Sequence, residues 1–153
     1  MASLNYNEVY SRFFSRVQAY DFLSITEEEL NEFLNSWLHS AMHKPYIRKL
    51  FKTIRFDDEV QSIEYEMSYN IDEYSDKEFI IEVGSLGIAI QWLEPKINNV
   101  LNIVQFFGSK EEKMYSQAAH LKETMALRDS FKKEQRQIIT DRGYMWNTYL
   151  YGE

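Results

Sequence analysis

Two histidines, His39 and His43, have the spacing that is best suited to metal chemistry in this chain. Four positions apart, they would place two imidazole rings on one helical turn, as in zinc peptidases that carry a glutamate directly after the first histidine. Here Ser40 takes the place of that glutamate, and the chain has only one further histidine, His120. We therefore predict ordinary polar-face histidines and no metal site.

Clustered carboxylates are the second group that could do chemistry, because paired acids can serve general acid–base catalysis. They occur as Asp57, Asp58 and Glu59, and as Asp72 and Glu73, within a stretch (57–82) that has ten acids and one lysine. Nothing in that stretch isolates one acid from water. No phosphate-binding loop, dinucleotide-binding turn or nucleophile elbow occurs in the chain. We predict no catalytic residue, no cofactor and no enzymatic activity.

A basic block lies just before the acids. Positions 44–55 contain five basic residues and no acid, and the basic residues are Lys44, Arg48, Lys49, Lys52 and Arg55. Interleaved with aromatic residues, they could contact phosphates, but an amphipathic helix with a buried aromatic side has the same pattern. We favour a protein partner or a solvated face. The two charge blocks could equally balance within one subunit.

The last residues are rich in aromatic side chains, whereas chain ends are usually polar and frayed. We predict a docking tail over 144–153 whose aromatic residues anchor in a partner's groove. Folding back onto its own domain is the alternative. The predicted docking residues are Tyr144, Met145, Trp146, Tyr149, Leu150 and Tyr151.

Apolar spacing and capping motifs predict the elements that hold these groups. We expect helices at 5–19, 26–43, 46–54 and 79–104, the last with a kink at Pro95, and a long helix from Lys110 or Gln117 to Arg142. Four capping boxes start helices: Asn5 with Glu8, Thr26 with Glu29, Ser75 with Glu78, and Ser109 with Glu112. The imperfect alternation after position 60 predicts a strand or short hairpin around 62–67, or an extended acidic loop.

Two features of the helices bear on packing. Gly84 and Gly87 would disfavour an exposed helix, so we expect them to let another helix approach closely. The long C-terminal helix has only a narrow apolar stripe, and we expect part of its partner surface to lie on another chain.

Composition limits the classes of protein. A length of 153 residues predicts one domain, and 5 Gly with 2 Pro favour helices over a turn-rich sheet. There is no cysteine, no signal-peptide pattern and no stretch apolar enough to span a membrane. The net charge of −7 argues against nonspecific nucleic-acid binding by the chain as a whole.

Two runs, 90–99 (IQWLEPKINN) and 105–129 (QFFGSKEEKMYSQAAHLKETMALRD), resemble small structural proteins of tailed phages that infect Gram-positive bacteria. The chain looks like a head-to-tail connector of the adaptor type, and the resemblance covers about its last two-thirds. It implies a mainly α fold, a bundle of four to five helices over 1–143 with an acidic loop or hairpin. The long acidic segment departs from a minimal adaptor and leaves open a role in the tail or baseplate.

The resemblance implies a homo-oligomeric ring in the virion neck, assembled in the host cytoplasm between the portal protein and a tail-proximal protein. Double-stranded DNA would pass through it without specific binding, and the basic block would pair with a neighbouring subunit's acids. A cytosolic module that binds a host protein is the competing class. The acids expected to line the channel are Asp57, Asp58, Glu59, Glu64, Glu66, Asp72 and Glu73.

Overall fold

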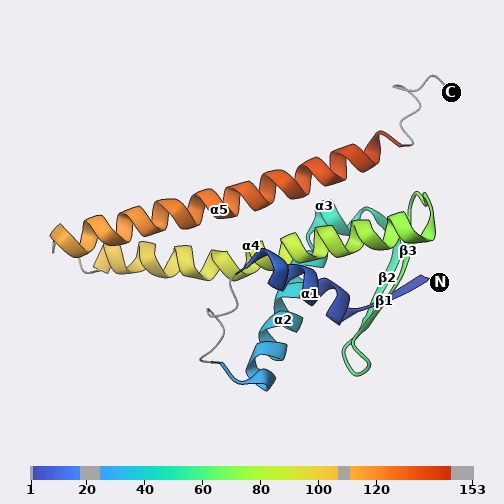
Figure 1. The fold of residues 1–153 in the computed structure, drawn as a ribbon, viewed down its shortest axis with the longest axis horizontal. Coiled ribbons are helices and arrows are strands. Elements are labelled where there is room, and N and C mark those ends of the chain that lie inside the picture. The colour runs from blue at the N-terminus through green and yellow to red at the C-terminus, as the bar shows by residue number, and fades with distance from the viewer. Residues whose placement is uncertain (1, 18–24, 107–110, 146–153) are drawn as a thin grey trace.

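The computed structural model describes residues 2–17, 25–106 and 111–145, with the backbone alone in 99–106 and 111–119. These residues form five helices and a small antiparallel sheet, so the expected mainly helical class is confirmed (Figure 1). The sheet makes the arrangement more than a simple bundle. In chain order the elements are β1 (Ala2–Asn5), α1 (Tyr6–Arg16), α2 (Glu27–Met42), α3 (Pro45–Arg48), β2 (Phe51–Asp57), β3 (Ser62–Met67), α4 (Glu73–Phe106) and α5 (Glu111–Gly143).

Helix α4 is the centre of the core. Every residue from Phe79 to Leu93 is buried except Glu82 and Gln91. A helix that is apolar all round needs cover on all sides, and α1, α2 and α5 pack against it. The prediction of a central core helix is therefore confirmed, and the helix continues through Pro95 to Phe106.

The predicted long C-terminal helix is also confirmed, as the 33 residues of α5. It runs side by side with α4, and the ends at which the two helices are connected extend past the N-terminal elements (Figure 1). At about 1.5 Å per residue, each helix is roughly 50 Å long.

Both glycines of α4 lie at close helix contacts, as expected. A Cβ on Gly87 would stand 2.6 Å from the Cβ of Ala41 in α2, and a Cβ on Gly84 would stand 3.1 Å from a methyl group of Val9 in α1. Their missing side chains set how closely α1 and α2 approach the core helix.

The three-stranded sheet has the order β1-β3-β2, and both pairings are antiparallel. Along β3, Ile63, Tyr65 and Met67 are buried, while the alternate positions Glu64 and Glu66 face outward. One face of the sheet thus closes the core and the other carries charge.

Several predicted boundaries were wrong. The helix expected over 46–54 ends at Arg48, and Phe51–Asp57 forms β2 instead. The β-branched and aromatic residues of this segment suit a strand once β3 lies beside it. Strand β1 was not predicted, and α1 ends at Arg16 rather than near Ala19, a residue outside the described parts of the chain.

The predicted capping residues were partly wrong. Thr26 caps α2, because its hydroxyl accepts a hydrogen bond from the backbone N–H of Glu29 at 3.2 Å. For α4, however, the cap is Asp72 rather than Ser75, since Asp72 Oδ1 accepts from the N–H of Ser75 at 2.7 Å. The helix therefore begins at Glu73, two residues before the predicted cap.

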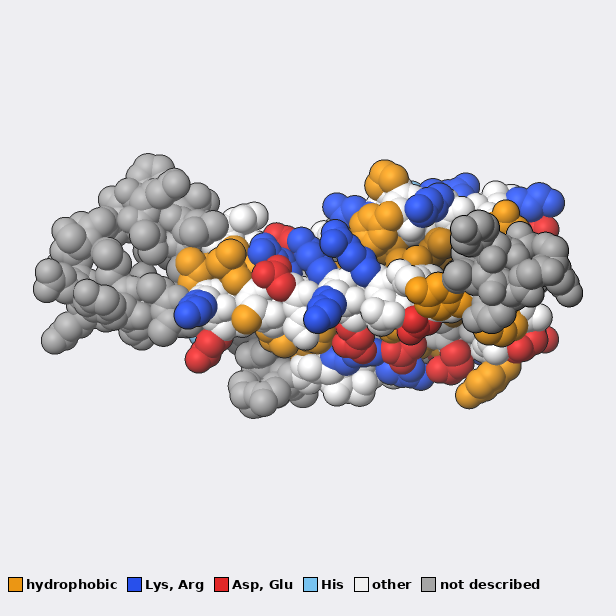
Figure 2. Space-filling view, turned by 90° about the horizontal axis from the view of Figure 1, so that it is seen from above, with side chains coloured by type: hydrophobic (Ala, Val, Ile, Leu, Met, Phe, Trp, Pro, Cys, Tyr) orange, Lys and Arg blue, Asp and Glu red, His pale blue; other side chains and the backbone are white. Residues whose placement is uncertain are grey.

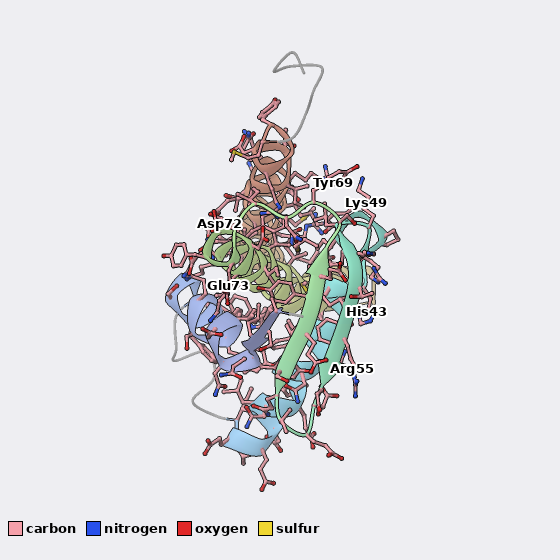
Figure 3. All side chains as sticks on the ribbon, turned by 90° about the vertical axis from the view of Figure 1, so that its right-hand side faces the viewer. His43, Lys49, Arg55, Tyr69, Asp72 and Glu73 are labelled. Atoms are coloured by element: carbon pink, nitrogen blue, oxygen red, sulfur yellow. The ribbon has the colours of Figure 1, made fainter. Side chains whose placement is uncertain are left out.

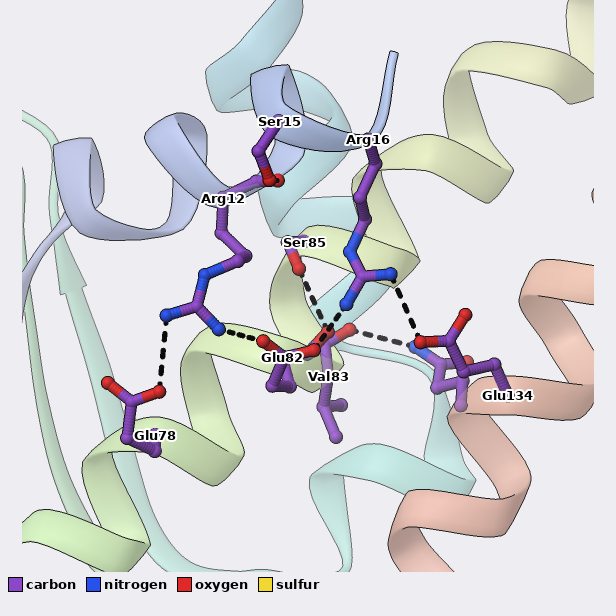
Figure 4. A network of polar contacts seen from close by, with 9 residues as sticks. Arg12, Ser15, Arg16, Glu78, Glu82, Val83, Ser85 and Glu134 are labelled. Carbon is purple, nitrogen blue, oxygen red and sulfur yellow. Dashed lines mark hydrogen bonds and ion pairs between the residues drawn. The ribbon is translucent and has the colours of Figure 1, made fainter.

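A network of ion pairs joins three helices (Figure 4). In α1, Arg12 contacts Glu78 at 3.1 Å and also contacts Glu82, both in α4. Arg16 contacts Glu82 as well, and it reaches Glu134 of α5 at 3.1 Å. Two acids at the end of the acidic stretch are thus neutralised inside the subunit and hold α1 in place.

Candidate interaction surfaces

The seven acids expected to line a channel lie in three places. Asp57, Asp58 and Glu59 are at the turn between β2 and β3, and Glu64 and Glu66 are on β3. Asp72 and Glu73 lie at the start of α4, beyond the other end of β3, and Figure 3 shows them away from the turn. The acids therefore face outward from several surfaces of the same end of the molecule.

Part of the basic block lies beside these acids on the outer face of the hairpin. Lys52 Nζ is 3.5 Å from Glu66 Oε1, and Arg55 stands opposite Glu64 in the register of β2 and β3. Arg48 donates instead to the backbone carbonyl of Phe51 at 2.9 Å. For Lys52 and Arg55, this arrangement favours charges that balance within one subunit.

The turn between β2 and β3 is held against two helices. Tyr6 Oη donates to Asp58 Oδ1 at 2.7 Å, and His39 Nε2 lies 2.8 Å from the same oxygen. The hydrogen bond from Tyr6, followed by the contact with His39, lowers the pKa of the Asp58 carboxyl. Burial, together with the bond to Asp58, raises the pKa of Tyr6. Asp58 thus fixes the turn to α1 and α2.

We expect this attachment to depend on pH below about 5. The pKa of Asp58 is lower in the folded state than in the unfolded state. The carboxylate therefore contributes to stability above the unfolded pKa, near 4, and this contribution is lost as the pH falls through the folded pKa. The variant Tyr6→Phe removes the largest cause of the shift. The difference in free energy of unfolding between the variant and the wild type is expected to shrink from pH 5 to pH 3, measured by urea denaturation.

The size of this effect is limited because the Asp58 side chain is 57% exposed; we expect less than about 1 kcal/mol. Tyr10→Phe is the matched control, since the Tyr10 hydroxyl donates to Asn35, an amide that does not titrate. Equal pH dependence for the two variants would contradict the assignment to Asp58.

A second surface is a groove of about 440 Å³ where α2 and α3 meet α4 and α5. We call it the basic groove, and its lining residues are Ala41, Lys44, Tyr46, Gly87, Ile90, Gln91, Glu94, Lys132, Gln135 and Arg136. Figure 2, which looks down on α5, shows Lys and Arg side chains gathered over the middle of this face.

Gln135 lies at the floor of the basic groove and is only 1% exposed. Its Nε2 donates to the carbonyl of Val83 in α4 at 2.9 Å, and its Oε1 accepts from the Tyr46 hydroxyl at 3.0 Å. One side chain thus sets α5 against α4 and places an aromatic ring at the edge of the groove.

The rim of the basic groove carries three cations, Lys44, Lys132 and Arg136, against one acid, Glu94. The Glu94 carboxylate is engaged by Lys132 at 3.2 Å and by Arg128 at 3.4 Å. In the described part of the chain, Lys44 and Arg136 form no ion pair, so the groove has a net positive charge.

The end of α5 is fixed by a buried arginine that sequence reasoning missed. Arg142 Nη2 contacts Asp76 Oδ1 at 2.5 Å and donates to the carbonyl of Tyr69 at 2.9 Å. Its guanidinium lies over the ring of Phe79, 4.6 Å from the centroid. Only 7% of Arg142 is exposed. This contact joins the last turn of α5 to the first turn of α4.

The predicted docking tail starts directly after this arginine. Tyr144 is 42% exposed and Met145 is 65% exposed. Trp146, Tyr149, Leu150 and Tyr151 lie outside the described residues. The buried arginine therefore fixes the position from which the tail begins.

The histidines of the metal hypothesis take other roles. His39 and His43 stack at 5.9 Å between ring centroids, and His43 Nδ1 is 2.6 Å from the carbonyl oxygen of His39. His120 lies on α5. Among the described residues, no group of three or more His, Asp and Glu side chains could hold a metal ion.

None of the helices in the described ranges is long and apolar enough to span a membrane. Searches of protein-family models, curated proteins and solved structures found no significant match to this chain. Its function must therefore be argued from the surfaces described above.

Proposed function

We propose that this chain is a structural subunit of a tailed phage, a head-to-tail connector adaptor that forms a ring between portal and tail. The observation that carries the proposal is the placement of two unlike charged surfaces on one subunit. The acidic turn between β2 and β3 points away from α5 in both Figure 1 and Figure 3, while the basic groove is partly lined by α5. Unlike surfaces on one subunit build head-to-tail contacts, which close into a ring when the rotation between neighbouring subunits closes.

The C-terminal tail would contact the portal. Tyr144 and Met145 are exposed immediately after the buried pair of Arg142 and Asp76. A fixed starting point lowers the entropy that a docking segment loses on binding. Aromatic residues that follow such a point suit the role of anchors in a partner's groove.

The acids at the start of α4 would face the channel. Asp72 and Glu73 line a groove of about 630 Å³ together with Glu66 and Asp76, and its other lining residues are Ala2, Tyr65, Met67 and Asn70. A ring that presents such a surface to its lumen would repel the phosphate backbone, so that DNA passes without sticking. The proposal involves no catalytic step and no cofactor.

A cytosolic module that binds a host protein is the second candidate. Phe33 is exposed on α2 and stacks on Trp37 with ring centroids 5.7 Å apart. An exposed phenylalanine on a half-buried tryptophan favours a protein partner. A tail or baseplate component would use the same surfaces at another place in the particle.

The proposal is tested by peptide mass spectrometry of purified particles of a phage that encodes the chain, with electron microscopy of the neck. We expect the chain at a fixed low copy number, and a ring below the portal. Particles produced without the chain should show heads and tails that fail to join, and supplying the chain from a plasmid should restore joining. Absence of the chain from clean, infectious particles would contradict the proposal and favour the host-binding module.

A further inference from the structure

We propose that the acidic turn of one copy inserts into the basic groove of a second copy. The acidic turn is defined as Asp57–Gln61, between β2 and β3. This inference rests on the proposed function, because it names the contact from which the ring would be built. Of the basic block that was expected to pair with a neighbouring subunit's acids, only Lys44 takes part in this contact, because Lys52 pairs with Glu66 of its own subunit.

The acidic turn is rigid and presents an apolar residue among acids. Asp57 Oδ1 accepts hydrogen bonds from the N–H groups of Glu59 at 3.0 Å and Val60 at 3.3 Å. Gln61 has a φ of 53°, in the left-handed region, and its carbonyl accepts from the N–H of Tyr6 at 2.9 Å. Val60 is 67% exposed at the tip. A turn held in this way loses little entropy on binding.

The hydrogen bonds of Asp58 leave its charge facing outward. The contacts with Tyr6 and His39 both end on Oδ1, and the side chain remains 57% exposed. Glu59 is exposed beside it. The exposed Val60 therefore directly follows two exposed carboxylates, Asp58 and Glu59.

The basic groove has the complementary arrangement. Its floor includes Ala41, Gly87 and Ile90, and its rim includes Lys44 and Arg136, which form no ion pair within the described parts of the chain. An apolar centre surrounded by a charged rim is typical of protein interfaces. Val60 would cover the apolar floor, and the carboxylates of the turn would meet Lys44 and Arg136.

A second copy fits the groove better than nucleic acid does. The chain has a net charge of −7, which opposes association with a phosphate backbone over a wide surface. The complementary acids are also present on the same chain, in a turn that points away from α5, the helix that lines one side of the groove (Figures 1 and 3). Because turn and groove differ, each copy can use both at once, as a ring requires.

The experiment measures self-association of the full chain by sedimentation velocity and native mass spectrometry over a wide concentration range. The groove variant is Lys44→Glu with Arg136→Glu, and the turn variant is Glu59→Lys with Val60→Lys. We expect each to raise the dissociation constant of self-association about tenfold or more, because like charges then face one another. The control is Lys49→Glu with Lys122→Glu, which reverses two exposed cations outside the groove and should associate like the wild type.

Mixing the groove variant with the turn variant gives the decisive result. Each partner then has one intact surface, so the mixture is expected to associate at concentrations at which the separate variants stay monomeric. Circular dichroism and thermal unfolding of every variant identify any that fail to fold. A wild type that stays monomeric, a groove variant that associates like the wild type, or a mixture without recovery would each overturn the inference.

Two further outcomes keep the inference separate from the proposed function. If the groove variant lost binding to a short DNA duplex while its self-association stayed unchanged, the groove would be assigned to phosphate and the inference would be wrong. If the variants behaved as expected but particles lacked the chain, the contact between copies would stand and the connector role would fail.

Discussion

Replacing Arg142 by methionine is expected to lower the free energy of unfolding by about 3–5 kcal/mol. The guanidinium and the Asp76 carboxylate are both almost fully buried, with side-chain exposures of 5% and 8%. Methionine keeps much of the length of the arginine side chain but leaves the Asp76 charge in the interior without its partner. Removing one member of a buried ion pair lowers stability far more than the intact pair raises it, because the remaining charge is then buried without water or an opposite charge. Urea denaturation followed by tryptophan fluorescence measures the loss.

Two further variants separate the charge effect from packing. Asp76→Asn combined with Arg142→Met removes both charges, and the asparagine oxygen can still accept from the N–H of Ile71, as Asp76 does at 3.2 Å. We expect the double variant to recover most of the stability that the single variant loses. Lys133→Met, at an exposed position of the same helix, should change stability by less than about 0.5 kcal/mol. Equal losses for Arg142→Met and Lys133→Met would show that the buried pair contributes nothing.

Replacing Gly87 by alanine is expected to destabilise the protein by about 1–3 kcal/mol. The new methyl group would stand 2.6 Å from the Cβ of Ala41 and 3.4 Å from Gln135 Nε2. Neither Cβ can rotate away, so α2 and α4 must separate. In an exposed helix the same substitution would stabilise by about 1 kcal/mol, so the sign of the change tests the close contact. Thermal denaturation gives the measurement.

A matched pair of variants isolates the cause. Gly84→Ala places its methyl group 3.1 Å from a methyl group of Val9, which needs a shift of only a few tenths of an ångström, and it should be close to neutral. Ala41→Gly combined with Gly87→Ala moves one methyl group across the interface and should restore most of the stability. If Gly87→Ala and Gly84→Ala behave alike, the approach of α2 to α4 does not depend on Gly87.

The helices were predictable from sequence because their signals are local. The run from Phe79 to Leu93 is apolar on all sides, and Thr26 with Glu29 forms the predicted capping pair. The two edge strands of the sheet, β1 and β2, were not predictable in this way. Ala2–Asn5 is a strand because it pairs with β3, about sixty residues along the chain. Phe51–Asp57 pairs with β3 across the turn 58–61, although its apolar spacing also fits a helix. No local pattern specifies such a pairing.

The interaction surfaces were predictable only in part. Lys44 lies on a basic surface, but its neighbours there are Lys132 and Arg136, about ninety residues away. Their spacing of four puts these two on one side of α5. The side of α5 that faces Lys44 depends on how α5 packs on α4. Gln135 fixes this packing through Val83, and Arg142 fixes it through Asp76. Two buried polar residues in a helix of mixed charge look the same in sequence as exposed ones.

The covering of α4 by α5 also fixes the order in which the fold can be completed during synthesis. The carbonyl of Val83 and the carboxylate of Asp76 receive their partners from Gln135 and Arg142, which are 52 and 66 residues further along the chain. Until those residues have been translated, the most apolar helix of the protein has one side exposed to solvent and to other nascent chains. Such exposed apolar surface promotes aggregation and recruits chaperones. A ribosome that stalls within α5 therefore produces a chain with nearly all of its core residues and no means of covering them.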